Sequence, residues 1–222
     1  MEKMETIGHY SPQDVIVCVD PGHGTREFTK GKCSPDRIYF EGEWARQMAV
    51  RVMDGLRDLG FDRRIIVPER EDIPLRERCR RANAVMAANP GKQVVYLSLH
   101  TNAAPGGGWS DASGLCVYVS RNASKASRIL ARNIYDVGDS MGFRGNRIVP
   151  EERFWQADFT VLTGTRMPAV LTESLFHTNR REVAFLLSEN GQDTIASMHI
   201  AGIARSFGIP CAIRTMRVPP GA

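Results

Sequence analysis

The sequence predicts a single α/β domain, with a central, twisted, mostly parallel sheet and helices on both faces. Apolar, β-branched runs such as VIVCVD (15–20) and QVVYLSLH (93–100) are typical of buried strands. The segments between such runs carry apolar residues at helical spacing. No internal repeat, low-complexity tract or linker divides the 222 residues, so one domain is expected. Strands that alternate with helices indicate a parallel sheet.

The first half of the chain begins with a strand and a glycine-containing turn. The helix that follows has Trp44, Met48, Val52 and Leu56 on one side and ends at Gly60. The expected order is a strand at 15–20, a loop at 24–40, a helix from Glu41 to Gly60, a strand at 63–68, a helix at 74–90 and a strand at 93–100.

The second half continues the alternation and ends in a long helix. We expect a loop at 101–113, a strand at 114–120, a helix at 123–141, an irregular aromatic segment, strands at 159–162 and 169–175, and a helix from Asn179 to Phe207 that is broken around Gly191. The domain boundaries follow: an N-terminal extension at 1–13, the domain at 14–207, and a loosely held, Pro-rich and basic tail at 208–222.

The composition excludes several classes of protein. Hydrophobic residues make up 42% and charged residues 24% of the chain, as in an ordinary globular protein. No apolar run of about 18 residues is present, so no membrane span is expected. The net charge of +4 is spread among mixed charges, which argues against a nucleic-acid partner but is compatible with weak attraction to an anionic polymer such as a cell wall. We expect a monomer.

Cysteine usage and the N-terminus give two further expectations. Five cysteines, without a CxxC pair, argue against a disulfide framework or an all-cysteine metal site. Cys18 and Cys116 lie in apolar runs and are expected in the core, whereas Cys33 lies in a polar loop and is interpreted as a free thiol without a role. The N-terminal segment lacks the apolar stretch of a secretory signal, so the protein is not exported by that route or its leader is missing from this sequence.

Polar side chains stand at the ends of three predicted strands. His23 follows the first strand, His100 ends the strand at 93–100, and Glu173 lies in the otherwise apolar run AVLTESL. A carboxylate in such a run is costly unless it is paired, bound to a metal or protonated. Ligands bind at the carboxyl ends of parallel strands, where Glu41, at the start of the first helix, can join these residues.

Two histidines and a carboxylate with an open fourth position are typical of a hydrolytic zinc site. The single-helix signature HExxH is absent, and on these residues alone structural histidines explain the pattern equally well.

The remaining histidines and tryptophans have simpler interpretations. We interpret His9 as exposed, His177 as capping a loop in preference to contacting substrate, and His199 as a buried histidine with satisfied hydrogen bonds. Trp109 and Trp155 are expected to pack their loops in preference to stacking on a ligand.

At these residues the sequence resembles the zinc-dependent N-acetylmuramoyl-L-alanine amidases of the type 3 class. These peptidoglycan hydrolases cut the amide bond between the lactyl group of muramic acid and the first L-alanine of the stem peptide. The matching segments are VDPGHG (19–24), EGEWARQMA (41–49), RCRRAN (78–83), YLSLHTNAA (96–104), ASGLCVYV (112–119) and TRMPAVLTESLFHTN (165–179). They keep the family's order, and their combination is specific.

The resemblance implies a fold, a cofactor and site roles. It implies Zn²⁺ bound by His23, Glu41 and His100, and Glu173 as the catalytic carboxylate that polarises the water or holds the proton of the leaving amine. It also implies peptidoglycan as the substrate and the cell wall as the place of action. The loop at 25–40 departs from the commonest form of the family, and neither a regulatory helix across the site nor wall-binding repeats are visible.

The helical pattern separates Glu41 from Glu43. Two residues along a helix point about 200° apart, so only one of these carboxylates can face a metal. Glu41 precedes Trp44 by three residues and shares the apolar stripe, whereas Glu43 lies off it and is expected to face solvent.

Two alternatives from other classes stay open. One is a zinc peptidase or amidase that acts on a different peptide, with the same metal site and a different cleft. The other is a non-catalytic wall-binding module of the same fold, although such a module has no need for Glu173.

Overall fold

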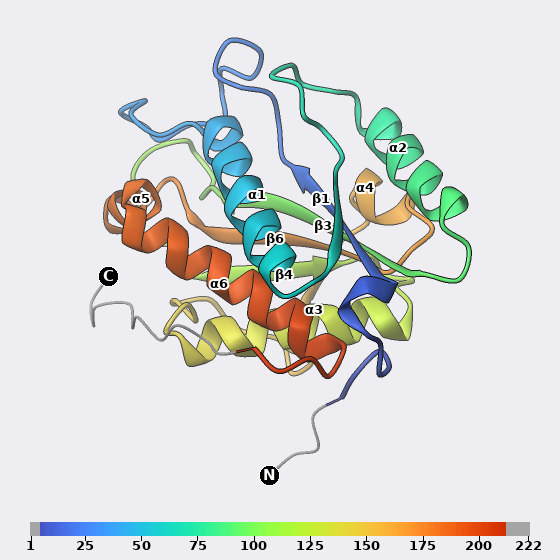
Figure 1. The fold of residues 1–222 in the computed structure, drawn as a ribbon. Coiled ribbons are helices and arrows are strands. Elements are labelled where there is room, and N and C mark those ends of the chain that lie inside the picture. Colours follow the sequence, from blue (N-terminus) through green and yellow to red (C-terminus); the bar gives the residue numbers. More distant parts are fainter. Residues whose placement is uncertain (1–4, 212–222) are drawn as a thin grey trace.

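A six-stranded sheet in the order β2-β1-β3-β6-β4-β5 forms the centre of the molecule (Figure 1), seen in a computed structural model that describes residues 5–211. The strands are β1 Val15–Pro21, β2 Asp62–Ile65, β3 Gln93–Asn102, β4 Leu115–Val119, β5 Trp155–Gln156 and β6 Ala169–Phe176. β1, β2, β3 and β6 run parallel, and β4 is antiparallel to β6. The predicted mostly parallel α/β fold is therefore confirmed, and the carboxyl ends of β1, β3 and β6 meet at one edge of the sheet.

Helices cover both faces of this sheet (Figure 1). They are α1 Glu41–Asp58, α2 Leu75–Ala88, α3 Lys125–Ser140, α4 Thr160–Thr163, α5 Arg180–Leu187 and α6 Glu189–Ser206, and a short 3₁₀ helix at Pro12–Asp14 precedes β1. Val15, Val17 and Val19 of β1 pack in the larger core beneath α1, α3 and α6. Ile16 and Cys18 point to the opposite face, into the smaller core beneath α2 and α4. We call this opposite side the α2/α4 face.

Alternation along the strands decides which polar side chains reach the α2/α4 face. Asp20 follows Ile16 and Cys18 at the period of two, and Ser98 and His100 follow Val94 and Tyr96 in the same way. Glu173 likewise continues the series Ala169 and Leu171 in β6. These side chains therefore emerge together where the parallel strands end.

Two elements differ from the sequence prediction. The run FTVL (159–162), predicted as a strand, forms the helical turn α4, in which Thr163 and Gly164 donate backbone hydrogen bonds to Phe159 and Thr160. Val161 and Leu162 are consecutive and both buried, a pattern that a one-face strand cannot produce. The strand at this edge is β5, at 155–156.

The break in the last helix lies three residues before the expected Gly191. Ser188 ends α5 and begins α6, and its hydroxyl accepts the amide hydrogen of Gly191 at 3.0 Å. A serine that caps the following helix marks such a break more directly than a glycine in its first turn.

The described part of the N-terminal extension lies against the last helix. The amide of Ile7 donates to the carbonyl of Ser206 at 2.8 Å, and the ring of Tyr10 contacts that of Phe207 edge-on, so the extension before β1 packs on α6. Most of the predicted tail, at 212–222, lies outside the described residues. Within residues 5–211, every helix is too short or too polar to cross a bilayer.

Candidate active site

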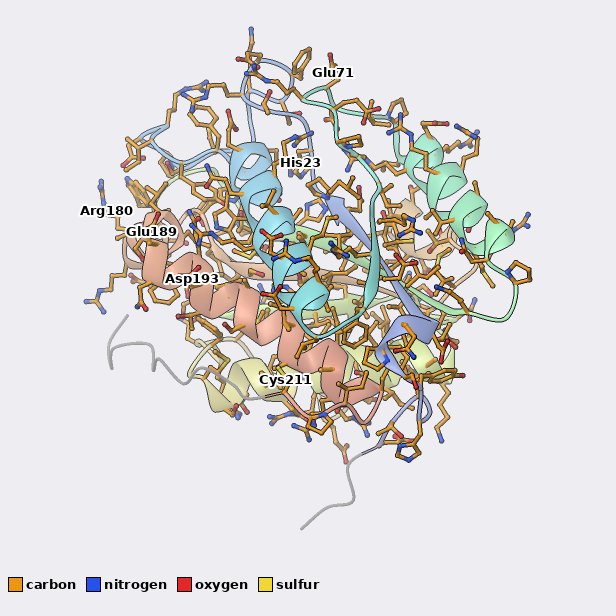
Figure 2. The ribbon with its side chains drawn as sticks, viewed as in Figure 1. His23, Glu71, Arg180, Glu189, Asp193 and Cys211 are labelled. Carbon is orange, nitrogen blue, oxygen red and sulfur yellow. The ribbon has the colours of Figure 1, made fainter. Side chains whose placement is uncertain are left out.

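The turn after β1 holds His23 in an unusual backbone conformation. The φ angle of His23 is 57°, in the left-handed region that non-glycine residues rarely adopt. Gly22 on one side has no side chain, and a Cβ there would lie 2.3 Å from Cε1 of His100. The turn thus directs the His23 ring toward the site, and the His100 ring lies against the backbone of Gly22. Figure 2 shows His23 beside the end of β1 and the start of α1.

A buried ion pair between Arg78 and Asp20 supports this turn. Arg78 is 1% exposed, and its guanidinium donates to Asp20 Oδ1 at 2.8 Å and to the carbonyl of Pro21 at 2.7 Å. Tyr96 and Ser98 donate to the other oxygen of Asp20 at 2.5 and 3.1 Å. Both carboxylate oxygens of Asp20 are therefore satisfied, which a buried charge requires.

The carbonyl of His23 is itself fixed. Nη1 of Arg46 donates to it at 3.0 Å and Nη2 of Arg78 at 3.4 Å. Because guanidinium groups are rigid forks, two of them on one carbonyl restrict the orientation of the turn.

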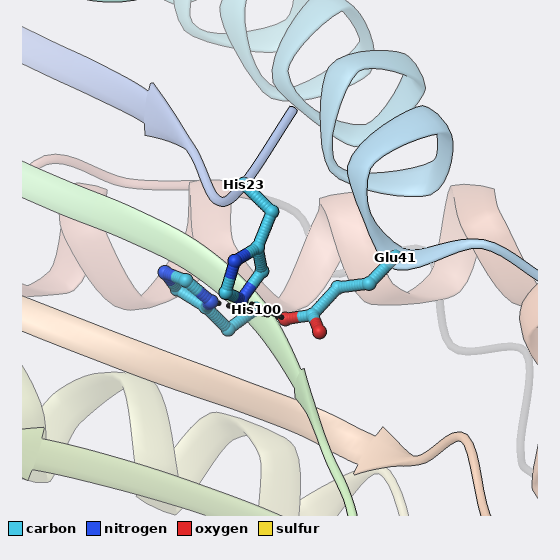
Figure 3. Close-up of side chains that lie close together, drawn as sticks. All are labelled: His23, Glu41 and His100. Carbon is cyan, nitrogen blue, oxygen red and sulfur yellow. Dashed lines mark hydrogen bonds and ion pairs between the residues drawn. The ribbon is translucent and has the colours of Figure 1, made fainter. Parts of the chain in front are cut away.

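Glu41 lies at the centre of the site. It is the first residue of α1 and 1% exposed. Its Oε1 lies 3.0 Å from Nδ1 of His100 and 3.5 Å from Nε2 of His23, and it accepts the amide hydrogen of Thr101 at 3.1 Å. Figure 3 shows the three side chains converging from β1, α1 and β3. α1 can approach so closely because Gly42 has no side chain: a Cβ there would lie 1.8 Å from the carbonyl oxygen of Gly24.

The three side chains fit a zinc ion. One ligand atom from each of His23, Glu41 and His100 lies within 4.8 Å of the others. A tetrahedral ion with bonds of about 2.0–2.2 Å needs donors roughly 3.4 Å apart. The distances from Oε1 of Glu41 to the nitrogens of His100 and His23, 3.0 and 3.5 Å, are close to this value. Oε2 of Glu41 is buried and, among the described residues, receives no hydrogen bond. Imidazole nitrogens with a carboxylate are the donors that zinc prefers, and a bound cation would satisfy this oxygen.

The charge state of Glu41 suits this role. Burial raises the pKa of the Glu41 carboxyl, but hydrogen bonds and charge from His100 and His23 outweigh it and hold that pKa well below its ordinary value.

A buried hydrogen-bonded chain lies beneath Glu41. Oη of Tyr39 lies 2.9 Å from Oγ1 of Thr101, which in turn lies 3.1 Å from Nδ1 of His177. That nitrogen is 4.0 Å from Oε2 of Glu41. Burial lowers the pKa of His177, although the charge of Glu41 opposes this shift. The chain thus supports the Thr101 amide that orients Glu41.

Glu173 stands next to His100. The two residues are paired in register across β3 and β6. Two residues after it, Leu175 has a φ of 70°, and the register between the strands shifts, so β6 bends at this point. Burial, followed by the charge of Glu41, raises the pKa of Glu173 well above its ordinary value, and Lys32 lowers it.

The side chains open into a cleft of about 640 Å³ on the α2/α4 face. His23, His100, Glu173 and Lys32 are among the residues that line it. The walls also contain the carboxylates Asp72 and Asp158, and their apolar part is formed by Ile73, Pro74, Leu75, Phe159, Val161 and Leu171. An apolar cleft with a few convergent polar groups is typical of a substrate site.

The other residues that the sequence analysis considered lie outside the cluster of His23, Glu41, His100 and Glu173. Glu43 accepts from the Arg26 side chain at 2.8 Å. His9 is exposed. Arg180 lies 4.2 Å over the Trp109 ring, and the ring of Trp155 contacts those of Tyr118 and Tyr135.

His199 is fully buried, as predicted, and its hydrogen bonds are satisfied. Its Nδ1 donates to the carbonyl of Ile195 at 2.8 Å, so its Nε2 accepts from the hydroxyl of Thr172 at 2.9 Å. Burial lowers the pKa of His199 to about 4. No disulfide bond forms among the cysteines of residues 5–211, and Cys18 and Cys116 are buried in strands.

Sequence reasoning missed the supports of the site. Asp20, Arg78, Tyr39, Thr101 and Lys32 were not singled out. One signal was available: Arg78 lies between Leu75 and Ala82 at helical spacing, and is therefore an arginine on the apolar side of its helix.

The comparisons with known proteins agree with this geometry. The family described as N-acetylmuramoyl-L-alanine amidase matches residues 17–205. This chain belongs to that family. The match covers β1 to α6 and all four residues of the cluster.

Individual relatives share the family. The chain is 34% identical over 136 residues to an endolysin of Bacillus phage SPP1, covering 60% of this chain and 45% of the endolysin. It is 28% identical over 200 residues to the N-acetylmuramoyl-L-alanine amidase CwlM of Bacillus licheniformis, covering 88% of this chain and 70% of CwlM. A crystal structure of an N-acetylmuramoyl-L-alanine amidase from Clostridium difficile 630 matches with a TM-score of 0.71 and 25% identity, covering 86% and 95% of the two chains. The chain thus spans less than half of the endolysin.

Proposed function

We propose that this chain is a zinc-dependent N-acetylmuramoyl-L-alanine amidase. It would hydrolyse the amide bond between muramic acid and the first L-alanine of the peptidoglycan stem peptide, and so act at the cell wall. The observation that carries the proposal is the convergence of His23, Glu41 and His100 within 4.8 Å, beside the half-buried carboxyl of Glu173. Family membership supports the choice of bond.

Each residue has a distinct task in this proposal. His23, Glu41 and His100 would hold the zinc ion. When bound, zinc supplies Lewis acidity that activates a water molecule and polarises the scissile carbonyl. The fixed turn around His23 and the Thr101 amide on Glu41 keep these donors in place, which avoids reorganisation during the reaction.

Glu173 would transfer the proton. Amide hydrolysis requires that the attacking water lose a proton and that the alanine nitrogen gain one before it leaves. A carboxyl whose pKa is raised by burial can accept the first proton and donate it to the nitrogen. The pairing of Glu173 with His100 in adjacent strands supports this role.

Digestion of purified peptidoglycan tests the proposal. The zinc-loaded protein should release stem peptides with free L-alanine N-termini from intact glycan strands, as seen by mass spectrometry. A chelator should abolish release, and added zinc should restore it. Peptides cleaved at internal bonds would indicate a peptidase instead. New reducing sugar ends would indicate a glycosidase, and either result would contradict the proposal.

A further inference from the structure

A second groove continues the cleft away from the metal donors. Its volume is about 580 Å³, and its lining includes Arg76, Arg80, Asn83, Thr160, Thr163 and Arg166. α2 and α4 form its two walls and lie side by side (Figure 1). Thr160 lines both the cleft and the groove, and Leu75 in the cleft is followed directly by Arg76 in the groove. A ligand can therefore run from one into the other.

The groove is positively charged. Its three charged lining residues are arginines, and no acidic side chain lines it. Arg80 is paired with Glu77, with contacts of 2.6 and 2.7 Å. Within residues 5–211, no ion pair or side-chain hydrogen bond occupies the guanidinium groups of Arg76 and Arg166. Two unpaired guanidinium groups on facing walls favour an anion, above all a carboxylate or a phosphate.

The walls are held at a fixed spacing. The Asn83 side chain donates to the carbonyl of Gly164 at 2.9 Å and accepts the amide hydrogen of Arg166 at 2.8 Å. The thiol of Cys79 contacts the carbonyl of Thr160 at 3.5 Å. α2 and the α4 turn are thus tied together, and the backbone that carries Arg166 is anchored on α2.

The length of the groove suits an extended peptide. From Arg76 to Asn83 the helix rises about 10 Å, at 1.5 Å per residue. Three residues of extended peptide span about the same distance. A substrate with its scissile amide beside Glu173 would pass the apolar wall first and then reach the arginines.

We infer that this groove binds the free carboxylates of the stem peptide on the C-terminal side of its first alanine. The inference rests on the proposed function, because that function places the stem peptide in the cleft. It assigns the leaving group to the α2/α4 side, and it assigns to Arg76 and Arg166 a preference for acidic over amidated stem peptides.

The test compares a variant that carries both Arg76→Gln and Arg166→Gln with the unaltered protein. The substrates are a muramoyl tetrapeptide with free carboxylates, the same tetrapeptide with amidated carboxylates, and muramoyl-L-alanine amide. The unaltered zinc-loaded protein should prefer the acidic tetrapeptide by about 10-fold in kcat/KM, a scale set by two partly exposed charge contacts. The double variant should lose most of this preference and should hydrolyse muramoyl-L-alanine amide normally.

A matched control and a binding measurement make the outcome decisive. Arg132→Gln removes the same charge from α3, where Arg132 faces Glu5, and should leave the preference unchanged. Calorimetry with the free acidic tetrapeptide should show weaker binding to the double variant, even without zinc. Equal preference in both proteins, or arginine-dependent binding of polyglycerol phosphate but not of the peptide, would overturn the inference. Arginine-dependent peptide binding without hydrolysis of any muramoyl peptide would uphold the groove and contradict the proposed function.

Discussion

Two pairs of carboxylates differ in how their oxygens are satisfied. Asp20, Glu182 and Glu41 are buried, and Glu173 is half-buried with its Oε2 inaccessible to solvent. Asp20 receives hydrogen bonds from Arg78, Tyr96 and Ser98. Glu182 receives the amide hydrogens of Gly114 and Phe176 at 2.8 and 2.6 Å.

The second pair, Glu41 and Glu173, is not fully hydrogen-bonded. Glu41 and Glu173 each keep one buried oxygen that, in the described part of the chain, receives no hydrogen bond. Among the same residues Oε2 of Glu43 is also without a partner, but Arg26 forms an ion pair with that carboxylate. An unsatisfied buried oxygen costs about 1–3 kcal/mol, and more when it is charged. A fold keeps such a cost where the oxygen serves another purpose. Asp20 and Glu182 therefore hold loops in place, and the free oxygens of Glu41 and Glu173 remain available for a metal ion and a proton. We therefore expect that a change around the first pair lowers the free energy of unfolding, whereas a change in the second pair lowers turnover or metal binding.

The largest expected effect follows from breaking a satisfied carboxylate. Arg78→Met leaves Asp20 buried without its cation, which should lower the free energy of unfolding by about 3–5 kcal/mol. Urea denaturation of the two proteins measures the difference. Arg57→Met is the control, because Arg57 is exposed on α1 and pairs with the exposed Asp54 and Asp58, and it should cost about 1 kcal/mol or less. A loss below 1 kcal/mol for Arg78→Met would mean that the ion pair does not hold the turn.

Glu173→Gln should have the opposite profile. The substitution keeps the shape of a side chain whose charged form is disfavoured by burial, so zinc content and the free energy of unfolding should be unchanged or higher. Turnover should fall by about 100-fold or more, the scale for a positioned acid–base group. Kinetics on a muramoyl peptide, together with metal analysis of the same sample, test both statements. Near-normal turnover would remove Glu173 from the mechanism.

The satisfied and unsatisfied groups also differ in how far sequence could predict them. His23, His100 and Glu173 follow apolar runs, and a parallel sheet brings strand ends together, so their proximity was predictable. Arg78 and Asp20 are 58 residues apart, and only the packing of α2 on β1 reveals their pairing. The same holds for Arg76 and Arg166, which are scattered charges in the sequence and line one groove in the fold.

The wrong prediction of a strand at 159–162 came from the shortness of that segment. The four residues of FTVL are too few to show a period of two or of 3.6, so β-branched composition alone favoured a strand. Tertiary packing against α2 decided for a helical turn.

The smallest expected effect comes from Glu43, two residues from the proposed ligand Glu41. Its Oε1 accepts from the backbone and side chain of Arg26 at 3.0 and 2.8 Å, and a quarter of its side chain is exposed. Glu43→Ala should therefore leave zinc content and turnover nearly unchanged and should lower the free energy of unfolding by about 1 kcal/mol or less. Glu41→Ala removes one of three metal donors and should sharply lower zinc affinity. Titration of both variants with a zinc indicator measures the contrast in a matched pair, since each loses one carboxylate from the first turn of α1. If Glu43→Ala lost the metal and Glu41→Ala kept it, the unpaired oxygen of Glu41 would have a different purpose, and Glu43, whose Oε2 also lacks a partner among the described residues, would be the metal donor of this helix turn.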